Sequence, residues 1–178
     1  PAEAAEKAAL AAAEATHGEA GISGQLRIGA PDGCANYLLP QILRDICAVH
    51  PGLEIQIVAL PRVVNLSRRE ADMAIAVSPP DTGRLSVQRL VDYQLHLAGH
   101  DDYLRAHPPI AELADLHRHR LIGYIPDMIF DRELDYLSEL GLDQVHLASN
   151  SVSVQLNWLR QGVGIGIVHD FALPFAPE

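Results

Sequence analysis

The chain has 178 residues, enough to bury a hydrophobic core, and its 48% hydrophobic and 20% charged residues are typical of a globular protein. Its formal net charge of −10 excludes strong non-specific binding to nucleic acid by this chain, because duplex affinity comes largely from lysine and arginine side chains. Its two cysteines, Cys34 and Cys47, form no CxxC pair, so neither a zinc ribbon nor a dithiol redox centre is indicated.

The first part of the chain predicts a helix followed by a parallel sheet. Residues 1–17 are rich in alanine and glutamate, which favour a helix. Such a helix buries too little apolar surface to be stable alone, so we expect it to pack on a second copy of the chain. A disordered tail is the alternative. Strands are expected at 25–30, 53–59 and 72–77, and helices at 36–50 and 65–71. This alternation is typical of parallel strands joined by crossover helices.

The second part predicts another α/β lobe. An extended stretch at 86–99 leads into a polar segment, residues 99–109, which we expect to be a hinge. Further helices are expected at 110–116, 132–140 and 151–161, and strands at 120–125, 144–148 and 163–168. The predicted fold is a two-lobed α/β clamshell with a linker helix at 1–20, a first lobe at 24–99, a second lobe at 100–170, and a return crossover beginning at 171–178.

The loops at the carboxyl ends of the strands should line a cleft between the lobes, where ligands of such proteins collect. Most of their side chains can exchange hydrogen bonds with a small molecule. The predicted ligand-binding residues are Asp32, Gly33, Cys34, Leu60, Arg62, Ser78, Tyr124, Ile125, Ser149, Asn150, Ser151 and His169. For Arg62, carboxylate binding and a solvated position at the rim are equally supported.

Four segments, in this order and spacing, resemble the effector-binding domain of LysR-type transcriptional regulators. They are SGQLRIGAPDG, YLLPQILRDICAVHPGLEIQIV, READMAIAV and SNSVSVQLNWLRQGVGIGIVHDF. The resemblance implies a fold like type II periplasmic solute-binding proteins, with a small-molecule effector in the cleft. It also implies that residues 1–17 end a linker helix, that DNA is bound through an N-terminal helix-turn-helix absent from this chain, and that the protein is a homodimer or homotetramer.

Family dimers commonly pair the first-lobe helix of one copy, here 36–50, with the second-lobe helix of another, here 151–161. Such an interface would use side chains such as Ile46 or Trp158, although core packing is the alternative for any apolar helix face. The expected apolar face of helix 36–50 consists of Leu39, Ile42, Leu43, Ile46 and Val49.

The sequence departs from the family in two places. In the family, the loop after the first strand often supplies serine or threonine to the effector. In this sequence the same loop contains Asp32, whose carboxylate at a helix N-terminus already occupies a position that favours an anion. The chain also ends at Glu178, where family members return to the first lobe, so part of that lobe is expected to be missing.

Other site chemistries are less well supported. The glycines at 162, 164 and 166 follow a helix and enter a strand, the reverse of a nucleotide-binding fingerprint. His117 and His119 could ligate a metal, but exposed loop histidines fit better. Cys34 could be a redox sensor, because a thiol pKa can fall at a helix start. The serines at 149, 151 and 153 fit helix capping better than a nucleophile. We expect no metal, no cofactor and no catalytic residue.

These observations favour a bacterial transcription regulator whose effector shifts a conformational equilibrium. The alternative is an exported solute-binding protein of a transporter with the same clamshell fold. An enzyme would need an acid/base pair, and none can be assigned. No apolar stretch reaches the roughly 20 residues needed to span a bilayer, and the N-terminus lacks the layout of a secretory signal, so we expect a cytoplasmic protein without membrane contact.

Overall fold

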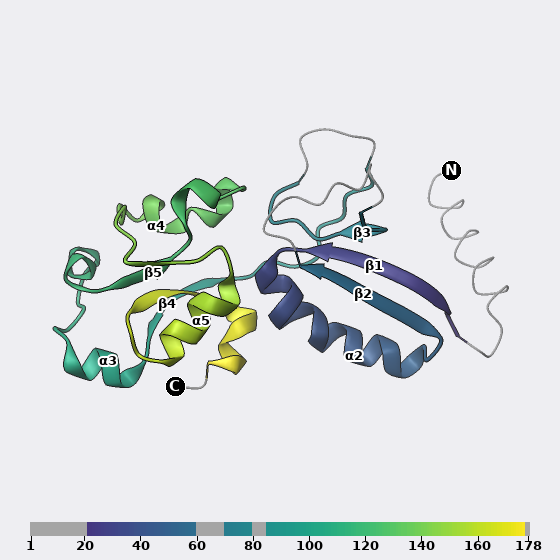
Figure 1. The fold of residues 1–178 in the computed structure, drawn as a ribbon, viewed down its shortest axis with the longest axis horizontal. Coiled ribbons are helices and arrows are strands. Elements are labelled where there is room, and N and C mark those ends of the chain that lie inside the picture. Colours follow the sequence, from purple (N-terminus) through teal and green to yellow (C-terminus); the bar gives the residue numbers. More distant parts are fainter. Residues whose placement is uncertain (1–20, 60–69, 80–84, 177–178) are drawn as a thin grey trace.

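The computed structural model describes residues 21–59, 70–79 and 85–176, and within these ranges the chain forms two sheets. The sheets lie side by side along the longest axis of the molecule, each with its own helices (Figure 1). This arrangement confirms the predicted two-lobed α/β fold. No helix in the described ranges is long and apolar enough to cross a membrane.

The first sheet is parallel and has the strand order β2-β1-β3. Its strands are β1 (Gly24–Ala30), β2 (Leu53–Ala59) and β3 (Met73–Ala74). Helix α2 (Leu39–Val49) follows a π-helical turn at Cys34–Leu38 and connects β1 to β2. The core of this lobe is formed by Ile28, Ala30, Ala35 and Leu39. It is small because only one helix covers the three strands in the described structure.

Helix α2 has a wider apolar surface than this sheet covers. Leu39 is buried, and Leu43 packs against the same core. By contrast, Ile42, Ile46 and Val49 are 47%, 38% and 70% exposed. The prediction of one inner face for all five residues is therefore only partly right, because a narrow sheet contacts a single stripe of the helix.

The second sheet is mixed and has the order β4-β7-β5-β6. Its strands are β4 (Leu95–Gly99), β5 (Leu121–Gly123), β6 (Leu147–Ala148) and β7 (Ile165–His169). Strand β7 pairs antiparallel with β4 and parallel with β5. The α-helices of this lobe are α3 (Asp101–Ala106), α4 (Tyr136–Glu139) and α5 (Val152–Arg160). Short 3-10 turns lie at Leu113–Arg118, Pro126–Met128, Arg132–Leu134 and Asp170–Phe175.

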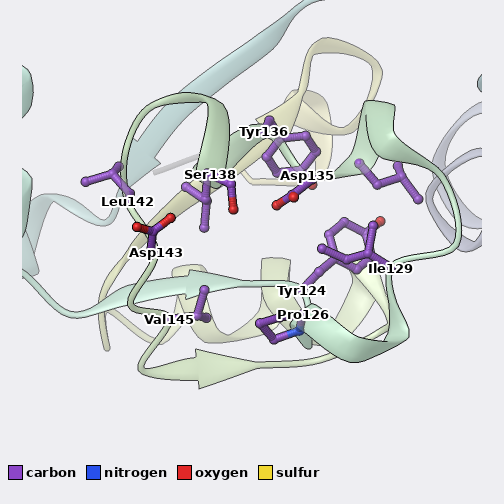
Figure 2. Close-up of a pocket in the computed structure, with 11 residues that line it drawn as sticks. Tyr124, Pro126, Ile129, Asp135, Tyr136, Ser138, Leu142, Asp143 and Val145 are labelled. Carbon is purple, nitrogen blue, oxygen red and sulfur yellow. The ribbon is translucent and has the colours of Figure 1, made fainter.

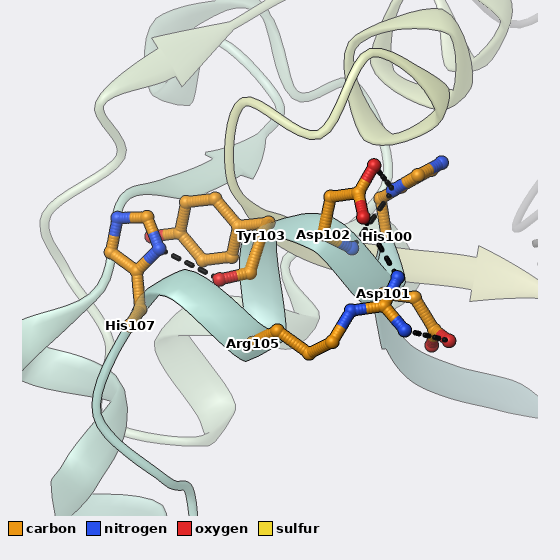
Figure 3. A network of polar contacts seen from close by, with 6 residues as sticks. All are labelled: His100, Asp101, Asp102, Tyr103, Arg105 and His107. Carbon is orange, nitrogen blue, oxygen red and sulfur yellow. Dashed lines mark hydrogen bonds and ion pairs between the residues drawn. The ribbon is translucent and has the colours of Figure 1, made fainter.

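The hinge expected over residues 99–109 is wrong, because this segment belongs to the second lobe. Strand β4 already pairs with β7, and α3 begins directly after it. The backbone N–H of Asp102 donates to Nδ1 of His100, which caps the helix (Figure 3). Arg105 forms ion pairs with Asp101 and Asp102. The chain therefore crosses between the sheets before β4, and residues 85–94, which lead into β4, have no regular secondary structure.

Several predicted elements are shorter than expected or broken. The buried strand predicted at 72–77 is reduced to β3, whose Met73 is 43% exposed. The helix predicted at 132–140 is divided between a 3-10 turn and α4. The linker helix at 1–20 and most of the helix at 65–71 lie outside the described residues.

Gly164, just before β7, gives a test of the close packing in the second sheet. A Cβ atom added there would lie 2.5 Å from the carbonyl oxygen of Arg120, which is backbone and has little room to move. We expect Gly164→Ala to lower the free energy of unfolding by about 1–3 kcal/mol in urea denaturation.

The matched control is Gly33→Ala. Gly33 has helical backbone angles, and its added Cβ would lie 3.4 Å from the nearest atom of Val152, an ordinary contact distance. Its effect should stay within about 0.5 kcal/mol. Equal losses in both variants would contradict the packing described here.

Candidate functional site

The loop after β1 reaches across to the start of α5 in the other lobe. Oδ2 of Asp32 accepts hydrogen bonds from the hydroxyl of Ser151 at 3.0 Å and from the backbone N–H of Ser153 at 3.2 Å. Ser151 is itself the N-cap of α5, since its Oγ accepts from the N–H of Val154. The sequence predicted a carboxylate at a helix N-terminus here. The structure shows that the helix is α5 of the second lobe, so Asp32 links the two lobes.

Three further contacts join the lobes beside Asp32. The hydroxyl of Ser78 donates to Oδ1 of Asp131 at 2.9 Å. The rings of Tyr37 and Phe175 lie 5.3 Å apart between centroids. Gly33 and Val152 are neighbours across the lobes, since a Cβ atom added at Gly33 would lie 3.4 Å from the Val152 side chain. The loops of the two sheets are thus in contact on more than one side of the space that they enclose.

A hollow remains between these contacts, with about 260 Å³ of empty space that includes some open to solvent. The residues that line it come from both lobes and from the segment that crosses between them. They are Pro31, Gly33, Cys34, Val77, Tyr93, Tyr124, Leu134, Val152, His169 and Phe171. Only about 20 Å³ of it is enclosed cavity volume, room for about one water molecule and far below the roughly 300–1,000 Å³ of usual small-molecule sites. A small-molecule ligand would therefore need the lobes to move apart from the arrangement described.

His169, at the end of β7, is the most unusual polar group in this hollow. Its side chain is only 5% exposed, and its Nδ1 makes no hydrogen bond with any described residue. It packs against the rings of Tyr93 at 5.4 Å and Phe171 at 5.1 Å between centroids. Burial lowers the pKa of His169 to about 4, because the imidazolium ion would lose its water. The ring is therefore neutral at pH 7.

A second hollow, with about 310 Å³ of empty space, lies within the second lobe and shares Tyr124 and Leu134 with the first. Figure 2 shows Tyr124 and Tyr136 at one end of it and Leu142, Asp143 and Val145 at the other. Burial raises the pKa of both tyrosines, so both hydroxyls stay protonated. The Tyr136 hydroxyl is buried beside the Tyr124 hydroxyl.

The structure brings together some of the predicted ligand-binding residues and separates others. Gly33, Cys34, Tyr124 and His169 line the hollow between the lobes. Asp32, Ser78 and Ser151 lie in the contacts that link the lobes. Ser149 stabilises the start of α5, since its Oγ accepts from the N–H of Ser151. Ile125 and Asn150 are half-buried outside the hollow, and Leu60 and Arg62 lie outside the described residues. A ligand-binding role for these residues stays a prediction.

Sequence reasoning missed most of the apolar lining of the hollow. Tyr93 lies in the irregular crossing segment, and Leu134 lies in a 3-10 turn that was expected to be part of a longer helix. Val152 directly follows the predicted cap residue Ser151, and Phe171 lies two residues after the predicted site residue His169. The search for polar loop residues passed over these apolar neighbours, although they make most of the surface that a ligand would contact.

Two expectations about single residues are wrong. Burial raises the pKa of the Cys34 thiol, so the lowered pKa on which the less supported redox-sensor alternative depended is not found. His119 is 2% exposed, where an exposed loop histidine was expected, because it packs near the ring of Tyr103. Within the described ranges, no group of three or more His, Cys, Asp or Glu side chains is placed to hold a metal ion.

Comparison with known proteins gives a consistent result. Residues 19–177 match the LysR substrate binding domain family. The chain is 23% identical over 154 residues to the HTH-type transcriptional regulator PtxR of Pseudomonas aeruginosa, covering 84% of this chain and 49% of PtxR. It is 24% identical over 164 residues to the transcriptional activator TtdR of Escherichia coli K12, covering 85% and 51%. The chain thus spans about half the length of these curated relatives.

Solved structures support the same fold. The regulatory domain of CrgA, a LysR-type transcriptional regulator from Neisseria meningitidis, superposes with a TM-score of 0.74 at 18% sequence identity. The alignment covers 86% of this chain and 76% of that domain.

The link between Asp32 and α5 predicts a measurable loss of stability on its removal. Asp32→Ala leaves the first N–H groups of α5 without a charged acceptor, so we expect the free energy of unfolding to fall by about 1–3 kcal/mol. The matched control is Asp127→Ala, which removes an exposed carboxylate from the turn at Pro126–Met128. Urea denaturation of both variants checks this, and equal effects would contradict the link.

The neutral state of His169 predicts a pH dependence of stability. Its pKa is about 4 in the folded chain against 6.5 ordinarily, so between these values the unfolded chain binds the proton. The contribution of the neutral His169 to the free energy of unfolding is therefore fully present above pH 6.5. It falls by up to about 3 kcal/mol as the pH drops from 6.5 towards 4. His169→Phe should lose less stability than the natural chain over this window in denaturation curves. Parallel curves would contradict the burial of a neutral imidazole.

Proposed function

Because the chain belongs to the LysR substrate binding domain family, we propose that it senses a small-molecule effector in the hollow between its lobes and so controls transcription. DNA would be bound by a helix-turn-helix domain elsewhere in the full protein, which fits the net charge of −10 on this chain. Such a regulator works in the cytoplasm, where its promoter is. The LysR family consists of transcriptional regulators rather than enzymes, so no catalytic residue is assigned.

The observation that supports this proposal best is the position of the lobe-to-lobe hydrogen bonds beside the hollow. The bonds of Asp32 to α5 and of Ser78 to Asp131 exist only while the loops are in contact. A ligand in the hollow touches both lobes, so its affinity depends on their separation. An effector with different affinities for two separations shifts the population between them, which is the physical requirement for a regulatory response.

The alternative function, a solute-binding protein of a transporter, is not supported. The relatives PtxR and TtdR are transcriptional regulators, and so is CrgA, whose regulatory domain has this fold. The shared clamshell alone does not separate the two functions.

A homodimer, or a homotetramer built from it, is the assembly that fits the exposed surface of α2. Ile42, Ile46 and Val49 form an apolar stripe at helical spacing that no described residue covers fully. On α5, Val154 is 39% exposed and Trp158 is half-buried. We propose that α2 of one copy packs against α5 of another.

A screen of small metabolites by thermal shift tests the effector proposal. A ligand at 100 times its Kd stabilises the folded state by about 2.7 kcal/mol, which raises Tm by several degrees. Val77→Phe fills the hollow and should abolish the shift. Val87→Phe, at a 59% exposed position outside the hollow, should keep it. A screen without any positive compound, or a shift that survives Val77→Phe, would contradict the effector site.

The dimer proposal predicts that Ile46→Arg weakens self-association. A buried cation without a partner at the centre of an apolar interface should raise the dimer Kd by about tenfold or more in sedimentation velocity. Ala48→Arg adds the same charge at an exposed position on the other side of α2 and should have little effect. A natural chain that sediments as a monomer at micromolar concentration would refute the interface.

A further inference from the structure

The contact between the two lobes differs from the interior of either lobe. The buried cluster of the first lobe contains no residue of the second, and the two clusters of the second lobe contain no buried residue of the first, within the described ranges. Side chains of the first lobe such as Tyr37 and Val77 are partly buried and only flank the second lobe's core. Lobes that share no buried core can move relative to one another at modest cost.

Asp32 makes more hydrogen bonds across this contact than any other described residue. Its Oδ2 accepts from the Ser151 hydroxyl at 3.0 Å and from the Ser153 N–H at 3.2 Å, at the start of α5. Its Oδ1 accepts from Nδ2 of Asn36 at 3.0 Å, which holds the carboxylate in its own loop. One oxygen is thus fixed within the first lobe while the other binds the second. The positive end of the α5 dipole strengthens the bonds to Oδ2.

The second polar contact, between Ser78 and Asp131, holds the lobes less firmly. The Asp131 oxygen that accepts from the Ser78 hydroxyl also accepts from the backbone N–H of Glu133 in its own lobe. This carboxylate therefore keeps a partner when the lobes separate. The Oδ2 atom of Asp32 has hydrogen bonds only to the start of α5 among the described residues, so it loses all of them on separation.

The bonds of Asp32 hold two opposite walls of the hollow together. Gly33 and Cys34, which line it on the first lobe, directly follow Asp32 in the chain. Val152, which lines it on the second lobe, directly follows Ser151. With these walls in contact, the enclosed volume is about 20 Å³, room for about one water molecule. A larger molecule can enter when the walls separate, and separation breaks the bonds of Asp32.

We propose that Asp32 and the start of α5 form a latch that keeps small molecules out of the hollow until the lobes separate. The arrangement described is then the closed, effector-free state of the domain. An effector binds after the latch opens, so its apparent affinity is reduced by the fraction of molecules that are closed. This inference rests on the proposed function, because it adds a regulatory step at the same site.

The thiol of Cys34 reports access to the hollow and requires no knowledge of the effector. Cys34 is half-buried in the lining, whereas Cys47 on α2 is exposed. Iodoacetamide is a small uncharged reagent, and the thiolate sulfur bonds to its carbon as iodide leaves. The rate at Cys34 is measured in a Cys47→Ala chain, and the rate at Cys47 in a Cys34→Ala chain, both by intact mass. Because burial raises the pKa of Cys34, the rates are compared per thiolate from their pH dependence.

The latch predicts that Cys34 reacts about 100-fold more slowly per thiolate than Cys47, because the reagent must wait for the lobes to separate. Asp32→Ala should raise the Cys34 rate about tenfold or more. Ser151→Ala should also raise it severalfold, since it removes one bond of the latch from the other lobe. It leaves every charge beside Cys34 unchanged, which separates lobe opening from a change in the pKa of the thiol.

Three further variants serve as controls. Ser149→Ala removes the bond that the Ser149 hydroxyl accepts from the Ser151 N–H, at the start of α5 but away from Asp32, and should change the Cys34 rate by less than about twofold. Asp127→Ala removes an exposed carboxylate elsewhere and should have no effect. The double variant Asp32→Ala/Ser151→Ala should react no faster than Asp32→Ala, because both changes open one latch. Far-UV circular dichroism confirms that each variant is folded.

Equal rates per thiolate at Cys34 and Cys47 would overturn the proposal, because the hollow would already be open. An unchanged Cys34 rate in Asp32→Ala would overturn it as well. Equal acceleration by Ser149→Ala and Ser151→Ala would replace the latch with fraying of α5, and effects that multiply in the double variant would show two separate contacts. All of these results leave the effector proposal standing, since the metabolite screen decides it separately.

Discussion

A carboxylate from one half of this molecule binds the start of a helix in the other half. Asp32 belongs to the loop after β1, yet its oxygen accepts the hydrogen bonds of Ser151 and Ser153 at the start of α5. The interaction is strong for its size because charge, helix dipole and partial burial act together. The contact of Gly33 with Val152 and the shape of the hollow both depend on where this carboxylate holds the loop.

The exclusion of water from the hollow explains why its His169 side chain is uncharged and packs among aromatic rings. Water is largely absent around His169, so the imidazole stays neutral and the rings of Tyr93 and Phe171 surround it. Burying the neutral ring costs less than burying the imidazolium ion would, although its Nδ1 has no hydrogen-bond partner among the described residues. When a ligand contacts both lobes, its affinity depends on the distance between them, which couples ligand binding to the conformation of the regulator.

The sequence predicts those parts of the structure that depend on local patterns. Strands β1 and β2 follow from alternation over residues 25–30 and 53–59, and α5 follows from its serine cap and the glycine after it. The hinge was misplaced because β4 is recognisable only through its pairing with β7, some seventy residues away. Likewise, His169 was predicted as a polar cleft residue, but its neutrality depends on rings from the crossing segment and from the residues after β7. The sequence placed the Asp32 carboxylate at a helix N-terminus, meaning the helix that follows it, whereas its bonds to α5 of the other lobe required the fold.

The distance between the lobes is the quantity that tests this account most directly. Spin labels on the exposed native Cys47 of α2 and on Glu139→Cys of α4, in a Cys34→Ala background, report it by pulsed electron paramagnetic resonance. We predict one narrow distribution with Asp32 present, and a broader distribution reaching longer distances in Asp32→Ala. Saturating effector should narrow the distribution of the variant again. Identical distributions with and without Asp32 would contradict the central role of this carboxylate.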